Sequence, residues 1–200
     1  MPRPWMDSVK DSRKLTVRNN IGSGNWSSLF SGGLREINRL MSSASLNITF
    51  QEATGDSSAD VIVAVSDGPI SFTYDGTTRT RAFENNRLHG YTGLIRREGN
   101  NYIERAFVFL PSAPEMNTPS GTRRTGIQVM TLILVHEFVH CCGLSDNDHS
   151  PDDIFNGNPT TNPGSRPDRD KVGIMGSNGY VWFPPYFLSN TTVGKIQSIW

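Results

Sequence analysis

Cysteine is scarce in this sequence: there are only two, Cys141 and Cys142, and they are neighbours. Adjacent cysteines seldom form a disulfide with each other, because the bridge strains the peptide between them. The chain therefore has no disulfide framework, which excludes the class of small secreted domains that depend on one. The two thiols are expected to be small, buried hydrophobic groups.

An excess of one charge is also absent, because 19 Lys and Arg residues are balanced by 19 Asp and Glu residues. Zero net charge provides no general attraction to nucleic acid or to an anionic membrane. The arginines therefore indicate a surface of mixed charge instead of a nucleic-acid footprint. Those considered are Arg79, Arg81, Arg96, Arg97, Arg123 and Arg124.

Long apolar runs are missing too. None reaches the length that spans a bilayer, and residues 1–10 are polar and lack the apolar core of a secretory signal. At 200 residues the chain is long enough for one domain with a substantial core. We therefore expect a single monomeric domain over residues 1–200, without a nucleic-acid or membrane partner. It would be cytoplasmic or exported by a signal-independent route.

Hydrophobic periodicity predicts an α+β fold, in which a twisted mixed sheet packs on a long helix. Residues 59–65 are densely β-branched and are expected at the centre of the sheet. Residues 90–97 carry charges at one end, as edge strands often do. Further strands are expected at 14–21, 47–53 and 103–110, the last ended by Pro111, whereas the polar stretch 68–89 is expected to be a loop.

The apolar pattern predicts two long helices in addition to these strands. Apolar residues recur every three or four positions from Trp26 to Met41, which indicates an amphipathic helix capped by Asn25 or Ser27. Residues 122–142 contain no proline and are apolar on nearly all sides, as in a helix buried at a domain centre. The glycine that follows, at position 143, is expected to end this second helix in a left-handed conformation.

Histidine is the other scarce residue, with four in the chain. Three of them, His136, His140 and His149, lie in or just after the buried helix. His136 and His140 are four residues apart, so they share one helix face and both can reach one zinc ion at about 2.0–2.1 Å. Glu137 would flank the ion and could touch its water without ligating the metal. The fourth, His89, lies in a polar stretch and is expected to be a surface residue.

The pattern HExxHxxG, formed by His136, Glu137, His140 and Gly143, resembles the start of the metzincin zinc-peptidase signature. The resemblance implies that the helix breaks at the glycine and that the chain turns back to supply a third ligand. The expected third position holds Asp146, and carboxylate oxygen is an acceptable zinc ligand. We favour His149, because zinc more often takes imidazole and because SPDDIF after it resembles the segment that follows the third histidine in matrixin-like sequences. Asp146 is the alternative.

The resemblance implies a matrixin-like domain, with an upper subdomain over 14–143 and a lower, irregular one over 144–200 that ends in a helix. It implies a methionine-containing turn at Met175, or at Trp182 in a second register, and a substrate pocket wall at Pro185 and Tyr186. The final helix is expected within 188–200, with Ser189 as its cap. Long loops are usually functional or mobile, and we expect the stretch 145–187 to be a solvated loop, with a calcium site as the alternative. Its candidate ligands are Asp146, Asp148, Asp152 and Asp153.

These features together predict a zinc-dependent endopeptidase, in which Glu137 acts as general base. An extended peptide would bind along residues 90–97 as an added strand, with Tyr91 and Gly93 in the substrate site. Two alternatives from other classes are a zinc hydrolase of a non-peptide amide and a catalytically silent zincin-fold domain that binds a partner.

Overall fold

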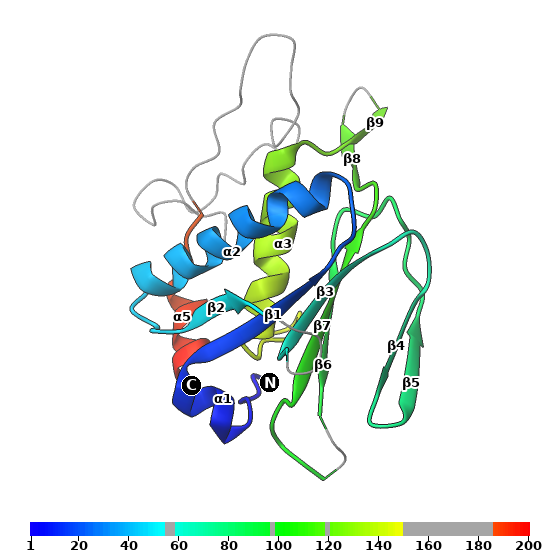
Figure 1. Cartoon of the computed structure of the whole chain (residues 1–200). Coiled ribbons are helices and arrows are strands. Elements are labelled where there is room, and N and C mark those ends of the chain that lie inside the picture. Colours follow the sequence, from blue (N-terminus) through cyan, green and yellow to red (C-terminus); the bar gives the residue numbers. More distant parts are fainter. Residues whose placement is uncertain (55–58, 97–98, 119–120, 150–185) are drawn as a thin grey trace.

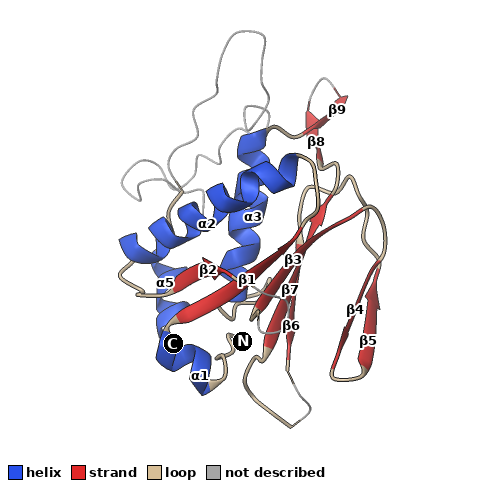
Figure 2. Cartoon of the chain, in the orientation of Figure 1, coloured by secondary structure: helices blue, strands red, loops and turns tan. Residues whose placement is uncertain are grey.

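A five-stranded mixed sheet forms the centre of the computed structural model (Figures 1 and 2). The structure describes residues 1–54, 59–96, 99–118, 121–149 and 186–200. Four strands run parallel, and the fifth, at one edge, is antiparallel to its neighbour. In spatial order they are β2 (Thr49–Glu52), β1 (Lys14–Asn20), β3 (Val61–Ser66), β7 (Arg105–Pro111) and β6 (Tyr91–Ile95). The expected central position of β3 and edge position of β6 are both confirmed.

Two long helices cover one face of this sheet (Figure 1). They are α2 (Asn25–Ser43) and α3 (Ile127–Cys141), and they cross in direct contact. At Gly33 a Cβ atom would lie 2.5 Å from Cδ2 of Leu134, so a glycine is what allows the two helices to approach this closely. The shorter helices are α1 (Asp7–Ser12) and α5 (Asn190–Gln197). The described residues thus form a mixed α/β domain that is compatible with the expected α+β class.

A hairpin covers the opposite face of the sheet, where the sequence had predicted a loop at 68–89. It consists of β4 (Ile70–Tyr74) and β5 (Thr77–Arg81), joined by Asp75 and Gly76. Both turn residues have positive φ, 50° and 75°, as in the type I′ turn that Asp-Gly favours between antiparallel strands. The prediction was wrong because every residue of β5 is exposed, so no apolar alternation marks that strand.

Three other boundaries differ from expectation. Helix α3 begins at Ile127 and not at 122, because 121–124 belongs to β9 (Gly121–Arg124), which pairs with β8 (Glu115–Thr118). Helix α2 has Gly24 as its N-cap, with no side-chain hydrogen bond, so neither Asn25 nor Ser27 caps it. Strand β7 includes Pro111 as its last residue, since proline is tolerated at a strand end where no further ladder bond is needed.

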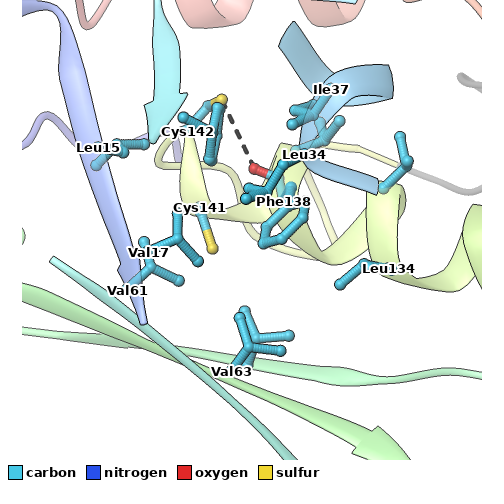
Figure 3. Packing of buried hydrophobic residues seen from close by; sticks show 14 of the residues in the cluster. Leu15, Val17, Leu34, Ile37, Val61, Val63, Leu134, Phe138, Cys141 and Cys142 are labelled. Atoms are coloured by element: carbon cyan, nitrogen blue, oxygen red, sulfur yellow. Dashed lines mark hydrogen bonds between the residues drawn. The ribbon is translucent and has the colours of Figure 1, made fainter. Parts of the chain in front are cut away.

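The main core lies between the helices and the sheet (Figure 3). Side chains from β1 and β3 meet Leu34 and Ile37 of α2 and Leu134 and Phe138 of α3. Cys141 and Cys142 are fully buried in this cluster and are unpaired thiols, as the sequence predicted. Among the described residues, no helix is both long and apolar enough to cross a membrane.

Candidate metal centre

The end of α3 is held in place by backbone carbonyl groups that accept hydrogen bonds from distant segments. The indole of Trp5 donates to the carbonyl oxygen of Cys141 at 2.7 Å, and that of Trp200 donates to Cys142 at 2.8 Å. Gly143 follows with φ 105°, and a Cβ there would lie 2.7 Å from Cδ1 of Ile199 and against the carbonyl oxygen of Arg3. The expected left-handed glycine is confirmed, and it turns the chain back beneath the helix.

This turn brings three imidazole rings together. The ring centroids of His136 and His140 are 4.4 Å apart, and that of His149 lies 4.9 Å from the first and 5.4 Å from the second. All three residues are buried, at 8 %, 3 % and 3 % exposure respectively. The Nε2 atoms of His136 and His140 lie 2.9 Å apart. A cluster of three buried imidazoles is a donor set suited to zinc.

The hydrogen bond made by Nδ1 of His140 identifies which ring nitrogen carries the proton. Its Nδ1 lies 3.0 Å from the carbonyl oxygen of Leu144, which can only accept a hydrogen bond, so Nδ1 carries the proton. The lone pair of neutral His140 is then on Nε2, which faces the other rings. Such a bond to the non-ligating nitrogen is the usual partner of a metal-ligating histidine. His149 has a comparable neighbour, because its Nδ1 lies 3.2 Å from Oγ1 of Thr192.

His136 differs from these two, since its Nδ1 is buried without a hydrogen-bond partner in the described part of the chain. Burial lowers the pKa of His136, and the nearby rings of His140, His149 and His89 lower it further. The imidazole is therefore neutral at physiological pH, which is the form that binds metals.

Asp146, the alternative third ligand, lies near the cluster but faces solvent. Its Oδ1 is 3.4 Å from Nε2 of His140, and its side chain is 99 % exposed. Asp148 is buried and accepts hydrogen bonds from the backbone N–H and the hydroxyl of Ser145, at 3.2 and 2.6 Å, so its carboxylate stabilises the turn. The other two expected calcium ligands, Asp152 and Asp153, lie outside the described residues.

Glu137 is buried beside the histidines, with 2 % exposure. Its Oε2 accepts a hydrogen bond of 2.6 Å from the hydroxyl of Thr92 on β6. Gly90, just before that strand, packs so closely that a Cβ would lie 2.6 Å from Cγ and 2.8 Å from Oε1 of Glu137. Burial raises the pKa of Glu137, while His140 and the Thr92 hydrogen bond act in the opposite direction. The carboxylate is thus held between α3 and the edge strand.

A pocket of about 290 Å³ joins these groups. One side is formed by the end of α3 and the following turn, and the other by β6 and the segment before it. The first side contributes His136, Glu137, Asp146 and His149, and the second contributes Arg87, His89, Gly90, Tyr91 and Thr92. His89 is exposed, as predicted, but also lines this pocket.

Sequence reasoning missed Arg87, Gly90 and Thr92, the pocket residues on the β6 side. The strand alternation could have indicated Thr92, because neighbouring residues of a strand face opposite sides. Gly93, expected to contact substrate, instead faces the hairpin, where a Cβ would lie 3.2 Å from the ring of Phe72. Tyr91 does line the pocket.

Tyr186, which was predicted to form a pocket wall, is not among the residues that line this pocket. Tyr186 packs against the main core, and its carbonyl oxygen accepts a hydrogen bond from Arg39 of α2. Burial raises the pKa of the Tyr186 hydroxyl, with the charge of Glu36 adding to the effect. Met175, Trp182 and Pro185 lie outside the described residues.

The spacing of the donors is tighter than a bound ion requires. Zinc–nitrogen bonds of about 2.0–2.1 Å in a tetrahedral site place two donor nitrogens about 3.3–3.4 Å apart. The 2.9 Å between the Nε2 atoms of His136 and His140 is shorter, so the two rings would have to open by a few tenths of an ångström. As placed in the described ranges, no group of three or more His, Cys, Asp or Glu side chains could hold a metal ion. The residues fit zinc by their chemistry, their burial and the proton held on Nδ1 of His140.

The chain matches no family model, and no curated protein matches its sequence. The function is therefore inferred from the side chains of the site themselves.

Proposed function

We propose that this protein is a zinc-dependent endopeptidase with a metzincin-like, zincin-type fold. The observation that carries the proposal is the convergence of three buried imidazoles, from α3 and the turn after it, beside the buried carboxylate of Glu137. Helix α3 packs next to an antiparallel edge strand, and the pocket lies between them. Neutral imidazole nitrogen is a preferred zinc donor, and three such rings buried side by side supply the number of protein ligands usual in a catalytic zinc site.

The proposed ligands are His136, His140 and His149. His149 is preferred to Asp146 because its ring is buried against both other imidazoles, whereas the carboxylate of Asp146 is almost fully exposed. Three neutral imidazoles also leave the ion its full positive charge, so it is a stronger Lewis acid than with a carboxylate ligand. Asp146 then lies at the mouth of the pocket, close to His140.

When bound, zinc supplies Lewis-acid polarisation of the scissile carbonyl and of the attacking water. The chain itself supplies the proton transfer, because Glu137 can accept the proton of the water and return it to the leaving amine. The Thr92 hydroxyl occupies Oε2 of Glu137, which leaves Oε1, beside Gly90, as the oxygen that handles the proton. The burial that raises the pKa of Glu137 makes it a better base once ionised.

The proposed substrate is an extended peptide. Strand β6 is the last in the sheet, and it leads directly from the pocket wall at Gly90 and Tyr91. Backbone groups at a free sheet edge can pair with a peptide as an added strand, which positions a peptide bond without reading its side chains. Strand β6 would therefore hold the substrate main chain next to Glu137.

The test compares wild-type protein with Glu137→Gln after loading with zinc. Cleavage of casein and of a peptide library is measured with and without a chelator, and bound zinc is measured by atomic absorption. We expect wild-type cleavage that the chelator stops and added zinc restores. Glu137→Gln should retain about one zinc per chain but lose activity by about 10²–10⁴-fold, the usual contribution of a general base.

Other outcomes separate the alternatives. Zinc binding with no peptide cleavage, but with hydrolysis of a small amide, would identify a non-peptide amide hydrolase. Zinc binding with no hydrolysis at all would identify a silent binding domain. A wild-type chain that binds no zinc would contradict the proposal as a whole.

A further inference from the structure

We propose that helix α5 sets the metal affinity of the site by positioning His149 through the hydroxyl of Thr192. This inference depends on the proposed function, because it takes His149 as the third zinc ligand. It assigns a role to the C-terminal helix, which lies more than 40 residues along the chain from the histidine that it contacts.

Helix α5 and Trp200, which follows it, contact residues 142–149, the turn after α3, at three points. Trp200 donates from its indole to the carbonyl oxygen of Cys142, and the ammonium group of Lys195 donates to that of Asp148. The third contact is between Oγ1 of Thr192 and Nδ1 of His149, at 3.2 Å. The C-terminal segment that contains α5 therefore holds this turn at Cys142, at Asp148 and at the ring of His149.

The Thr192 hydroxyl is itself fixed by the start of α5. Thr192 is completely buried, and its backbone N–H donates to Oγ of Ser189, the N-cap, at 3.2 Å. The Ser189 hydroxyl in turn donates to Oγ1 of Thr192 at 3.1 Å. A capping residue thus defines where the threonine oxygen lies, and that oxygen is directed at an imidazole nitrogen.

The contact between Thr192 and His149 matters because metal binding requires a particular tautomer of histidine. A histidine that binds metal through Nε2 must carry its proton on Nδ1, and a hydrogen-bond acceptor at Nδ1 selects that tautomer and fixes the ring plane. The carbonyl oxygen of Leu144 serves His140 in this way. Oγ1 of Thr192 lies 3.2 Å from Nδ1 of His149 and can accept the proton of that nitrogen, which would place the lone pair of the neutral ring on Nε2.

The experiment measures zinc affinity in solution, independently of turnover. The dissociation constant is determined by competition with a chromophoric chelator for wild type, Thr192→Val, Thr192→Ser and Thr191→Val. Thr191→Val is the matched control, because Thr191 is an exposed threonine on the same helix turn. Circular dichroism and the melting temperature of each metal-free protein monitor the fold.

We expect Thr192→Val to weaken zinc binding about 10- to 100-fold, the usual effect of removing such a partner of a ligand. Thr192→Ser, which keeps the hydroxyl, and Thr191→Val should stay within about twofold of wild type, by comparison with that effect. If Thr192→Val does not fold, Thr192→Ala, which adds no bulk, should show the same loss.

Each contrary outcome has a distinct meaning. Equal affinity of wild type and a folded Thr192→Val or Thr192→Ala variant would overturn the role of Thr192 and leave the zinc site standing. A weakening in Thr192→Ser as large as in Thr192→Val would show that packing, and not the hydroxyl, is what matters. Failure of the wild type to bind zinc would overturn the proposed function together with this inference.

Discussion

The two faces of the central sheet differ in how they are covered and in what they carry. Strand β7 contributes to both: Ala106 and Val108 point to the helices, while Phe107 and Phe109 point to the hairpin. The helical face is packed by α2 and α3 into the main core. The hairpin face has only a small cluster, formed by Ile70, Phe72, Phe83, Ile95 and Phe109.

The difference matters because the candidate metal site belongs to the helical face alone. Two of its histidines, His136 and His140, are part of α3, and their positions depend on a tightly packed helix that cannot shift without opening the core. The hairpin contacts the site only indirectly, through β6. Packing changes on the helical face should therefore affect metal binding, whereas changes on the hairpin face should affect stability with little effect on the metal.

The largest expected effect follows from Phe138→Ala. Phe138 is fully buried and lies on α3 between His136 and His140, with its ring 5.4 Å from that of Phe50. Loss of this ring should lower the free energy of unfolding by about 3–5 kcal/mol, as for other buried aromatic residues. Zinc affinity should fall as well, because the helix turn that holds both ligands loses its packing. Denaturant unfolding and zinc titration measure the two effects, and unchanged zinc affinity would break the link between core and site.

Gly90→Ala should have the next largest effect, and we expect it to lower catalytic activity. The new Cβ would lie 2.6–2.8 Å from three atoms of Glu137, so the carboxylate must move. Displacement of a catalytic group by an ångström costs about 10²-fold in rate, and we expect kcat to fall by about that factor. Gly68→Ala is the control, since nothing lies within 4 Å of a Cβ there. Equal activity of both variants would show that the contact with Gly90 does not position Glu137.

Phe72→Ala tests the hairpin face. The Phe72 ring stacks on Phe107 with centroids 4.9 Å apart and is 6 % exposed, but its cluster is small and lies at the edge of the sheet. We expect a loss of about 2 kcal/mol in unfolding free energy, below the usual range for a buried phenylalanine. Zinc affinity should be unchanged. A loss of zinc comparable to that of Phe138→Ala would remove the distinction between the two faces.

The smallest effect is expected for Thr92→Val. It removes the 2.6 Å hydrogen bond to Oε2 of Glu137 but keeps the shape of the side chain. We expect kcat to fall about tenfold, near the lower end of what a hydrogen bond to a charged group contributes. KM and zinc affinity should stay the same, and Thr92→Ser should restore kcat. A rise in KM with kcat preserved would instead assign Thr92 to substrate binding.

The same two faces show how much of the fold can be predicted from sequence. The helices and the parallel strands of the helical face have regular apolar periods, so α2, α3, β1 and β3 were all anticipated. The hairpin face was missed, because β5 is entirely exposed and β4 is only five residues long. A strand that buries its apolar residues against a small cluster leaves too short a pattern to detect.

Prediction of the site had a similar limit. His136, Glu137 and His140 could be identified because local helix geometry alone places them together. Gly90 and Thr92 reach Glu137 only through the pairing of β6 with β7, and Thr192 reaches His149 only through the docking of α5. Contacts of this kind depend on tertiary structure, and no spacing in the sequence encodes them.

Crystals grown with zinc and measured at the zinc absorption edge test the central claim most directly. We expect one strong anomalous peak between the imidazoles of His136, His140 and His149, with Glu137 near the ion but not bound to it. A peak bound by Asp146 with His149 turned away would contradict the ligand assignment. No peak at these histidines in fully loaded crystals would contradict the metal site itself.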